Sequence, residues 1–510
     1  MATKEQLRVE LLRGQFARPE DLYRCCITAL DLDLAAAVLA RIVPLTSGPL
    51  ARDPRVWQIT GLAHRALQDS AAANAAFDRA AKLAPHDKLI AHSLARTALE
   101  AGYSAAALFD QALRLDRDDV SLLQGRAAAL LSDGEGIVAI AELRERLAAG
   151  PNWIDGHRTF AKIQAMVAPD SDVLETVRLA VALMPGSLQL WALMIEIAMQ
   201  ADDYLLARQC VAAARRALGD HPEFERAEAI CLGETGDFVE AQQLFERLPI
   251  LARGAVVIHP LRNLIRLGRY DDAMRLADQR LPGEEDLALW PYRALLWRAT
   301  GDSRWDELEG DPRLIGTFDI GHSIGPIDEL VDVLRHIHRG RGGPIDQSVR
   351  GGTQTDGNLL ARAEPALRRL RVALLDAVQT HVDQLPPYRA DHPCLLAIRD
   401  PVQFKGAWSV RLRGEGFHVD HVHPQGWLSS AFYAALPAGA GGIDSDGRTE
   451  SGWLTFGEAR TLIPGLKAFR TVAPKVGTLV LFPSTMWHGT RPFKQGERIT
   501  VAFDVARPRQ

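Results

Sequence analysis

The sequence feature that most constrains the fold is an internal repeat in the first 300 residues. Prolines stand at positions 85, 151, 185 and 222, at intervals of 66, 34 and 37 residues. A period near 34 residues, once doubled, is typical of stacked helix pairs, each of which buries its apolar face only against its neighbours. The sequence therefore predicts an α-helical superhelix over residues 50–305, preceded by a helical segment at residues 1–49.

The segment before Pro85 resembles a tetratricopeptide repeat. The small and aromatic residues that carry this resemblance are Trp57, Gly61, Ala73, Phe77 and Ala80. Small residues allow two helices to approach closely, and aromatic residues fill the space to the next helix pair. Stacks of such repeats present a concave surface that commonly receives a peptide or a partner domain. The resemblance therefore implies a protein or peptide partner.

Composition excludes several other classes of protein and partner. Hydrophobic residues make up 47% of the 510 residues, which is typical of a globular protein. The net charge of −5 and the lack of a long basic run argue against nucleic acid as a partner. No apolar stretch approaches the ~18 residues that a membrane span needs, and the five cysteines show no CxxC spacing. These observations predict a cytoplasmic protein without a membrane partner.

The last 205 residues, 306–510, follow a different pattern. Helices are expected at 325–338 and 359–384. Short β-branched runs separated by glycine and proline follow at 407–412, 427–436, 466–472, 478–482 and 498–505. Such runs predict an antiparallel jelly roll with helices outside it. The whole chain is thus expected to be an α+β multidomain protein, with a boundary near residue 306.

Histidines are concentrated near the predicted strands. His418, Asp420, His421 and His423 lie within six residues of one another, and His488 follows a later strand. Side chains two apart on a strand share a face, so a metal ion is predicted to take either His421 with His423 or His418 with Asp420, together with His488. Two close ligands and one distant histidine give the open facial arrangement of non-haem Fe(II) oxygenases, although imidazole also suits Zn and Cu.

A second feature favours a 2-oxoglutarate enzyme. Arg498 stands ten residues after His488, and Thr500 is in phase with it on the final predicted strand. A guanidinium grips a carboxylate through two parallel hydrogen bonds, and a hydroxyl can assist. Arg498 and Thr500 are therefore predicted to bind the distal carboxylate of 2-oxoglutarate. Ser430 and Tyr433, on an earlier strand, are further candidate contacts, and Trp427 and Trp487 are expected to form pocket walls.

The C-terminal part resembles the 2-oxoglutarate/Fe(II) oxygenases of bacteria and phages that carry an HxH-Pro motif. The segments that carry the resemblance are 349–355, 421–433, 481–488 and 498–503. The resemblance implies a double-stranded β-helix that uses Fe(II), 2-oxoglutarate and O₂. It also implies that His421, His423 and His488 hold the metal and that Arg498 holds the cosubstrate. His418 with Asp420 stays open as the alternative first pair.

These features together predict an Fe(II)- and 2-oxoglutarate-dependent dioxygenase that hydroxylates a protein or peptide recruited by the repeats. The alternative is a protein-binding scaffold whose oxygenase-like domain is inactive. Because residues 340–510 contain every predicted ligand, a fragment beginning near residue 306 is expected to keep both metal and cosubstrate binding.

Overall fold

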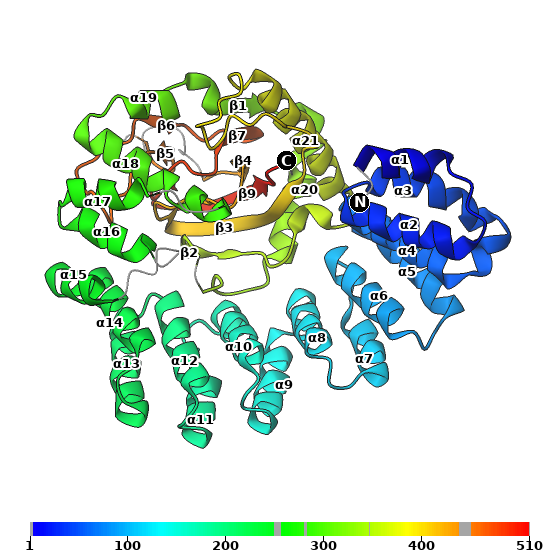
Figure 1. Ribbon diagram of the computed structural model, residues 1–510, viewed down its shortest axis with the longest axis horizontal. Coiled ribbons are helices and arrows are strands. Elements are labelled where there is room, and N and C mark those ends of the chain that lie inside the picture. Colours follow the sequence, from blue (N-terminus) through cyan, green and yellow to red (C-terminus); the bar gives the residue numbers. More distant parts are fainter. Residues whose placement is uncertain (1–3, 249–256, 280–282, 346, 438–449, 509–510) are drawn as a thin grey trace. The chain divides into compact units, whose positions relative to one another are not determined.

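The computed structural model describes residues 4–248, 257–279, 283–345, 347–437 and 450–508. The chain forms two compact units (Figure 1). The first comprises Met1–Glu142 with Asp356–Arg368, and the second comprises Leu143–Thr355 with Arg369–Gln510. Among the described residues, no helix has both the length and the apolar character that crossing a membrane requires.

The first unit is built from helices connected by short turns. Their bounds are α1 Lys4–Arg13, α2 Pro19–Asp31, α3 Ala35–Ile42, α4 Pro54–Ala66, α5 Ser70–Leu83, α6 Lys88–Glu100, α7 Ala106–Leu115 and α8 Val120–Asp133, followed by α9 Gly136–Ala149, which begins in the first unit and ends in the second. Aspartates start several of these helices: Asp53, Asp69 and Asp87 accept hydrogen bonds from backbone N–H groups of the first turn. A Cβ added to Gly61 would lie 2.7 Å from the Phe77 ring, so this pair packs as the repeat pattern predicts.

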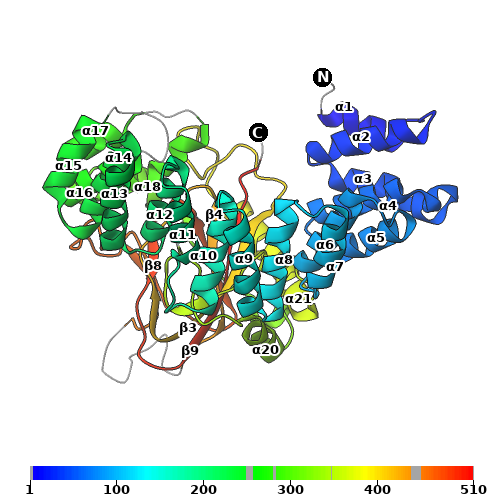
Figure 2. The ribbon, with the colours of Figure 1, turned by 90° about the horizontal axis from the view of Figure 1, so that it is seen from below.

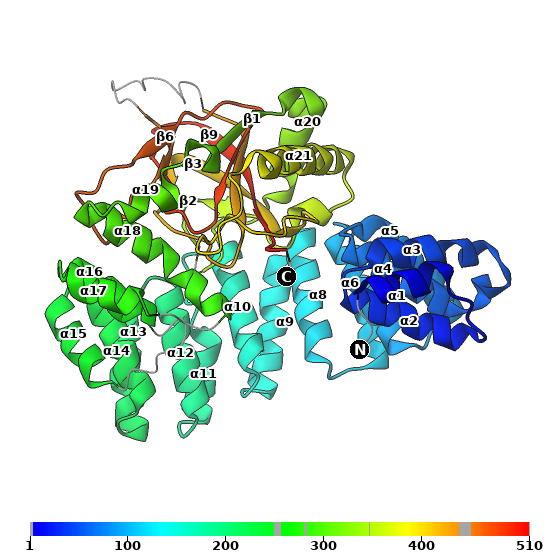
Figure 3. The same cartoon turned by 45° about the horizontal axis from the view of Figure 1, so that its top comes forward.

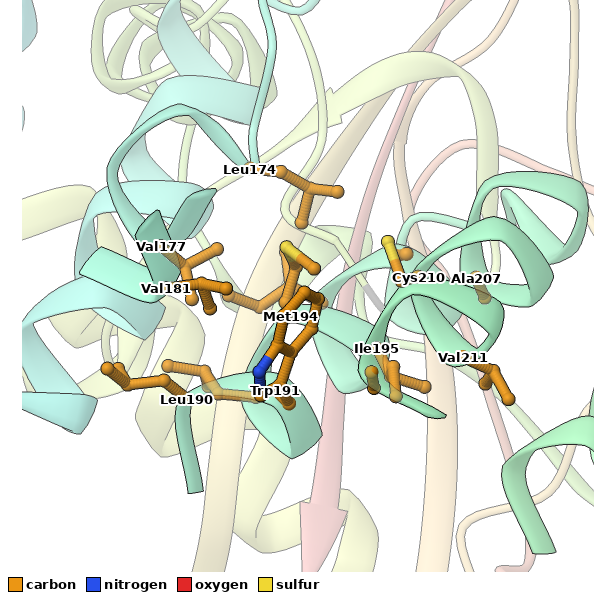
Figure 4. Close-up of a cluster of buried hydrophobic side chains, with 14 of the residues drawn as sticks. Leu174, Val177, Val181, Leu190, Trp191, Met194, Ile195, Ala207, Cys210 and Val211 are labelled. Atoms are coloured by element: carbon orange, nitrogen blue, oxygen red, sulfur yellow. The ribbon is translucent and has the colours of Figure 1, made fainter. Parts of the chain in front are cut away.

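The helices continue through the second unit. Their bounds are α10 Ile154–Val167, α11 Glu175–Leu183, α12 Leu188–Gln200, α13 Tyr204–Leu218, α14 Pro222–Thr235, α15 Phe238–Arg247, α16 Ile258–Arg266, α17 Tyr270–Ala277, α18 Trp290–Thr300 and α19 Arg304–Glu309. Neighbouring helices share apolar clusters. Figure 4 shows one, in which Trp191 and Met194 of α12 lie between Val177 of α11 and Cys210 of α13.

The spacing of the prolines has a structural reason. The indole Nε1 of Trp191 donates to the carbonyl of Pro185, six residues earlier, at 2.9 Å. In the preceding repeat, Nε2 of His157 lies 3.0 Å from the carbonyl of Pro151 at the same offset. Proline is favoured at such a turn because it cannot continue a helix, and the carbonyl of the turn residue accepts from a ring of the next helix whichever residue supplies it. The periodic prolines therefore mark the turns between repeats.

The C-terminal part contains two antiparallel sheets. The larger has strand order β1-β7-β4-β9-β3-β2 and the smaller β6-β5-β8. The strands are β1 Gly316–Asp319, β2 Val349–Gln354, β3 Phe404–His418, β4 Leu428–Ala435, β5 Leu454–Phe456, β6 Arg470–Val472, β7 Thr478–Pro483, β8 His488–Thr490 and β9 Glu497–Val505. The sheets pack through rings such as Phe456 and Phe482, whose centroids are 5.0 Å apart. Figure 2 shows the neighbouring strands β3 and β9 side by side.

The predicted α+β class, helical repeats followed by a β-sheet domain, is confirmed. Some element bounds differ from the prediction. The strand expected at 466–472 is formed only by Arg470–Val472, and the helix expected at 359–384 is α21, Pro365–Gln384, preceded by the 3₁₀ turn Leu359–Ala361. Proline favours the first helical position, which explains the later start. The helix expected at 325–338 is α20, Ile327–Ile337.

One hydrophobic cluster joins the last repeat helices to the β-sheet domain. It contains Leu261 and Leu264 of α16, Tyr292 of α18, Leu462 and Trp487. Arg298 of α18 donates to the carbonyl of Gly457, and Figure 3 shows α18 beside the strands. The domain boundary near residue 306 stays a prediction, but the residues on its two sides share a core.

Candidate metal centre

Three histidine rings converge at one end of the sandwich. His421 and His423 lie in the connection between β3 and β4, and His488 opens β8. His421 and His488 form an isolated β-bridge, with N–H to carbonyl distances of 2.9 and 3.1 Å. One ring nitrogen from each histidine lies within 4.8 Å of the others. The bridge between distant segments is therefore what brings the late histidine to the early pair.

Each of the three rings uses Nδ1 for a hydrogen bond to an oxygen that can only accept. The acceptors are the carbonyl of Val419 for His421 at 2.7 Å, the Asp504 carboxylate for His423 at 2.9 Å and the carbonyl of Met486 for His488 at 2.9 Å. Nδ1 of each ring therefore carries a proton, which leaves Nε2 as the nitrogen that could bind a metal ion. Burial, reinforced by the neighbouring imidazole of His423, lowers the pKa of His421 to about 3. Burial also holds the pKa of His488 well below its ordinary value.

The alternative pair is directed elsewhere. Asp420 accepts from Nε and NH2 of Arg460 at 2.8 and 2.7 Å and from its backbone N–H at 2.9 Å, with a side chain only 2% exposed. Nδ1 of His418 lies 3.1 Å from the Ser348 hydroxyl, and that hydroxyl also lies 3.3 Å from Nε2 of His421. His418 thus borders the cluster, whereas both carboxylate oxygens of Asp420 are engaged by Arg460.

A pocket opens beside the histidines. Alternate side chains of β9, namely Arg498, Thr500 and Ala502, line it together with the three rings. The Arg498 side chain is buried, its NH1 donates to the carbonyl of Gly452 at 3.0 Å, and within the described ranges its Nε has no hydrogen-bond partner. Burial lowers the pKa of this guanidinium. A buried cation with a free donor at a polar pocket is suited to an anionic ligand.

Tyr433 and Ser430, the two further candidate contacts, differ in whether their hydroxyl groups have hydrogen-bond partners. The guanidinium carbon of Arg498 lies 5.2 Å from the centroid of the Tyr433 ring, whose buried hydroxyl finds no partner among the described residues. Burial raises the pKa of this phenol. The Ser430 hydroxyl instead donates to the carbonyl of Phe503 at 2.9 Å and accepts from its N–H at 2.8 Å. Ser430 lines the pocket, but its hydroxyl proton is committed to that carbonyl, so its contact with a cosubstrate stays a prediction.

Both tryptophans expected as pocket walls point elsewhere. Trp427 donates to the carbonyl of Cys394 at 2.8 Å, and Trp487 donates to the carbonyl of Pro291 at 3.0 Å. Trp408 of β3 lines the pocket in their place, 5.6 Å from the His423 ring. A buried indole N–H needs a hydrogen-bond acceptor, and the carbonyl toward which it turns cannot be identified from the local sequence.

Sequence reasoning also missed Asp504. This residue is in phase with Arg498 and Thr500 on β9, so the period of two that linked those residues extends to it. Ser348, from the segment before β2, was also missed. No local sequence pattern points to it, because only the pairing of β2 with β3 brings it to His418.

Three imidazoles whose ring nitrogens lie close together, beside a buried guanidinium in a β-sandwich, are a donor set suited to a metal-dependent oxygenase of the 2-oxoglutarate type. Residues 406–504 match the family model described as "Putative 2OG-Fe(II) oxygenase". The C-terminal part of the chain therefore carries an oxygenase domain of this family, as its sequence motifs predicted. The family implies Fe(II) and 2-oxoglutarate, the predicted cofactor and cosubstrate.

The chain also has similarity to several solved structures. HygX from Streptomyces hygroscopicus, with nickel and 2-oxoglutarate bound, shares 12% identity over 38% of this chain and 82% of its own, with a TM-score of 0.26. A Pseudomonas putida prolyl-4-hydroxylase shares 16% identity over 38% of this chain and 94% of its own, with a TM-score of 0.26. Yeast Tom70 shares 16% identity over 61% of this chain and 65% of its own, with a TM-score of 0.32. A comparison with curated proteins finds no match.

Proposed function

We propose that the protein is an Fe(II)- and 2-oxoglutarate-dependent dioxygenase that hydroxylates a protein or peptide held by its repeats. The observation that carries this proposal is the single pocket shared by the cluster of His421, His423 and His488 and by the buried side chain of Arg498. A hydrolytic zinc site would explain the histidines but not the guanidinium.

The donor set fits Fe(II). His421, His423 and His488 would hold the ion through Nε2, since each Nδ1 is hydrogen-bonded. Three protein ligands leave coordination positions open for a cosubstrate and O₂. When bound, Fe(II) and O₂ convert 2-oxoglutarate to succinate and CO₂ and supply the oxidant that hydroxylates a C–H bond.

The polar groups beside the histidines fit a dicarboxylic acid. The unpartnered Nε of Arg498 and the unpartnered hydroxyl of Tyr433 are both buried, and each would donate to one carboxylate. Thr500 lines the same pocket and would add a third donor. A buried hydrogen-bond donor without an acceptor destabilises the protein. A ligand that supplies the acceptor removes this free-energy cost, which strengthens its binding.

The repeats support the substrate class. Helix pairs of this kind bind extended peptides on their concave side, and here the last of them share a core with the domain that carries the histidines. A substrate bound non-covalently along the repeats would be held by the same chain that carries the metal site. Binding energy from contacts far from the reacting atom would then position that atom at the metal.

Succinate release tests the proposal. Purified protein supplied with Fe(II) and 2-oxoglutarate is incubated with a peptide library, and succinate and a mass increase of one oxygen atom are measured. His488→Ala should abolish both signals, whereas His336→Ala, a matched change at an exposed histidine of α20, should preserve them. Metal binding without succinate formation under any condition would support the scaffold alternative instead.

A further inference from the structure

In a His-x-Asp site a carboxylate is itself a metal ligand. In this protein a carboxylate lies next to the histidine cluster and contacts one of its rings. Both oxygens of Asp504 lie near Nδ1 of His423, at 2.9 and 3.0 Å. The Asp504 side chain is 15% exposed, so water screens this pair only weakly. The carboxylate therefore faces the ring, on the side opposite to the lone pair of Nε2.

A network of hydroxyl groups holds this carboxylate in place. The Ser429 hydroxyl donates to Oδ1 of Asp504 at 2.6 Å and lies 2.9 Å from the hydroxyl of Ser484. The backbone N–H of His423 donates to the carbonyl of Ser484 at 2.9 Å. Ser484 thus contacts the main chain of the histidine directly and is linked to the carboxylate through Ser429, and this network fixes the direction of Nε2.

We propose that Asp504 is a positioning residue that holds the Nδ1 proton of His423 and supplies negative charge to the metal through that imidazole. This inference rests on the ligand set of the proposed function. Fe(II) with three neutral imidazoles keeps a charge of 2+, whereas a carboxylate ligand would lower it to 1+. A carboxylate bonded to the far nitrogen of a ligand imidazole makes that imidazole a stronger donor and fixes its tautomer.

The alternative carboxylate provides a matched control. Asp420 lies in the same loop as His423 with its side chain 2% exposed, but its oxygens are engaged by Arg460 rather than by an imidazole. Replacing either aspartate with asparagine removes one negative charge near the cluster and keeps the side-chain shape. Of the two changes, only the one at Asp504 removes a carboxylate that is hydrogen-bonded to a ring of the proposed ligand set.

The test uses the full-length protein and Co(II) alone, followed by visible absorption. Asp504→Asn should weaken Co(II) binding about 10- to 100-fold, as changes at such outer carboxylates do, and should shift the absorption bands of the bound ion. Asp420→Asn should bind Co(II) more tightly than Asp504→Asn, because it leaves the hydrogen bonds of the three rings in place. Unchanged affinity in Asp504→Asn, or an equal loss in both variants, would overturn the inference.

Two further variants keep the outcome interpretable. If Asp504→Asn does not fold, Ser429→Ala removes the 2.6 Å hydrogen bond that orients the carboxylate and should cost about fivefold in Co(II) affinity. Unchanged affinity in that variant overturns the inference. His423→Ala distinguishes a failure of the proposed ligand set from a failure of the role of Asp504. If His423→Ala binds Co(II) as the wild type does, the proposed ligand set is wrong. If His423→Ala loses Co(II) binding while Asp504→Asn binds normally, only the role of Asp504 is refuted.

Discussion

Arg498 offers the sharpest test of cosubstrate binding. Its NH1 is committed to the carbonyl of Gly452, and its Nε has no partner in the described part of the chain. A carboxylate bound there would gain two charge-assisted hydrogen bonds, each worth about 1.5–3 kcal/mol. Arg498→Ala removes both and should weaken 2-oxoglutarate binding about 10²- to 10⁴-fold, since 1.4 kcal/mol is about one factor of ten.

Arg498→Lys gives an intermediate expectation. The ammonium keeps the positive charge and about one of the two hydrogen bonds but cannot reproduce the planar fork, so the loss should be about 10- to 100-fold. The assay is calorimetric titration of the metal-loaded protein with 2-oxoglutarate under anaerobic conditions. Metal affinity, measured in parallel, should not change in either variant.

A matched control comes from the neighbouring strand. Arg411 of β3 is paired with Glu497 at 2.6 Å and does not line the pocket, so Arg411→Lys should leave 2-oxoglutarate binding unchanged. If Arg498→Ala binds 2-oxoglutarate within threefold of the wild type, the guanidinium does not hold the cosubstrate, and the assignment of this pocket to a dicarboxylic acid is refuted.

Three further predictions follow from buried groups. Tyr433→Phe should weaken 2-oxoglutarate binding about fivefold in the same titration and leave thermal stability unchanged or higher, because the hydroxyl has no partner in the described protein; unaltered binding would exclude the phenol from the site. Burial raises the pKa of Glu309 from 4.5 to about 7, so its contribution to the free energy of unfolding is fully present below pH 4.5 and is lost as the pH rises through about 7. That contribution is about 3 kcal/mol, at ~1.4 kcal/mol per pKa unit. Glu309→Gln should therefore reduce the difference between the free energies of unfolding measured by urea titration at pH 5 and at pH 8. An equal difference in the variant and the wild type would contradict this. A fragment beginning at residue 143 should fold and bind Co(II), whereas one beginning near residue 306 should be strongly destabilised in circular dichroism melts, because it exposes Leu462 and Trp487 at about 1.5–3 kcal/mol each. A stable 306–510 fragment that binds Co(II) would restore the expectation drawn from the sequence.

The sequence alone predicted the features that depend on local pattern. The proline period marked the repeats because a turn must recur wherever a helix pair ends. The spacing of His421 and His423 marked a pair of potential ligands, since alternate residues share a face. Arg498 and Thr500 were linked for the same reason, and both line the pocket.

Tertiary structure decided everything that depends on which segments meet. The bridge between His421 and His488 joins residues 67 positions apart in the chain, and although the sequence named His488 as the distant ligand, no local pattern predicts that its backbone pairs with that of His421. The direction of Asp420 was likewise open until Arg460, forty residues later, was found to engage both of its oxygens. A polar side chain turns toward whichever buried partner satisfies it, and that partner is known only once the chain has folded. Asp504 became a candidate positioning residue for this same reason.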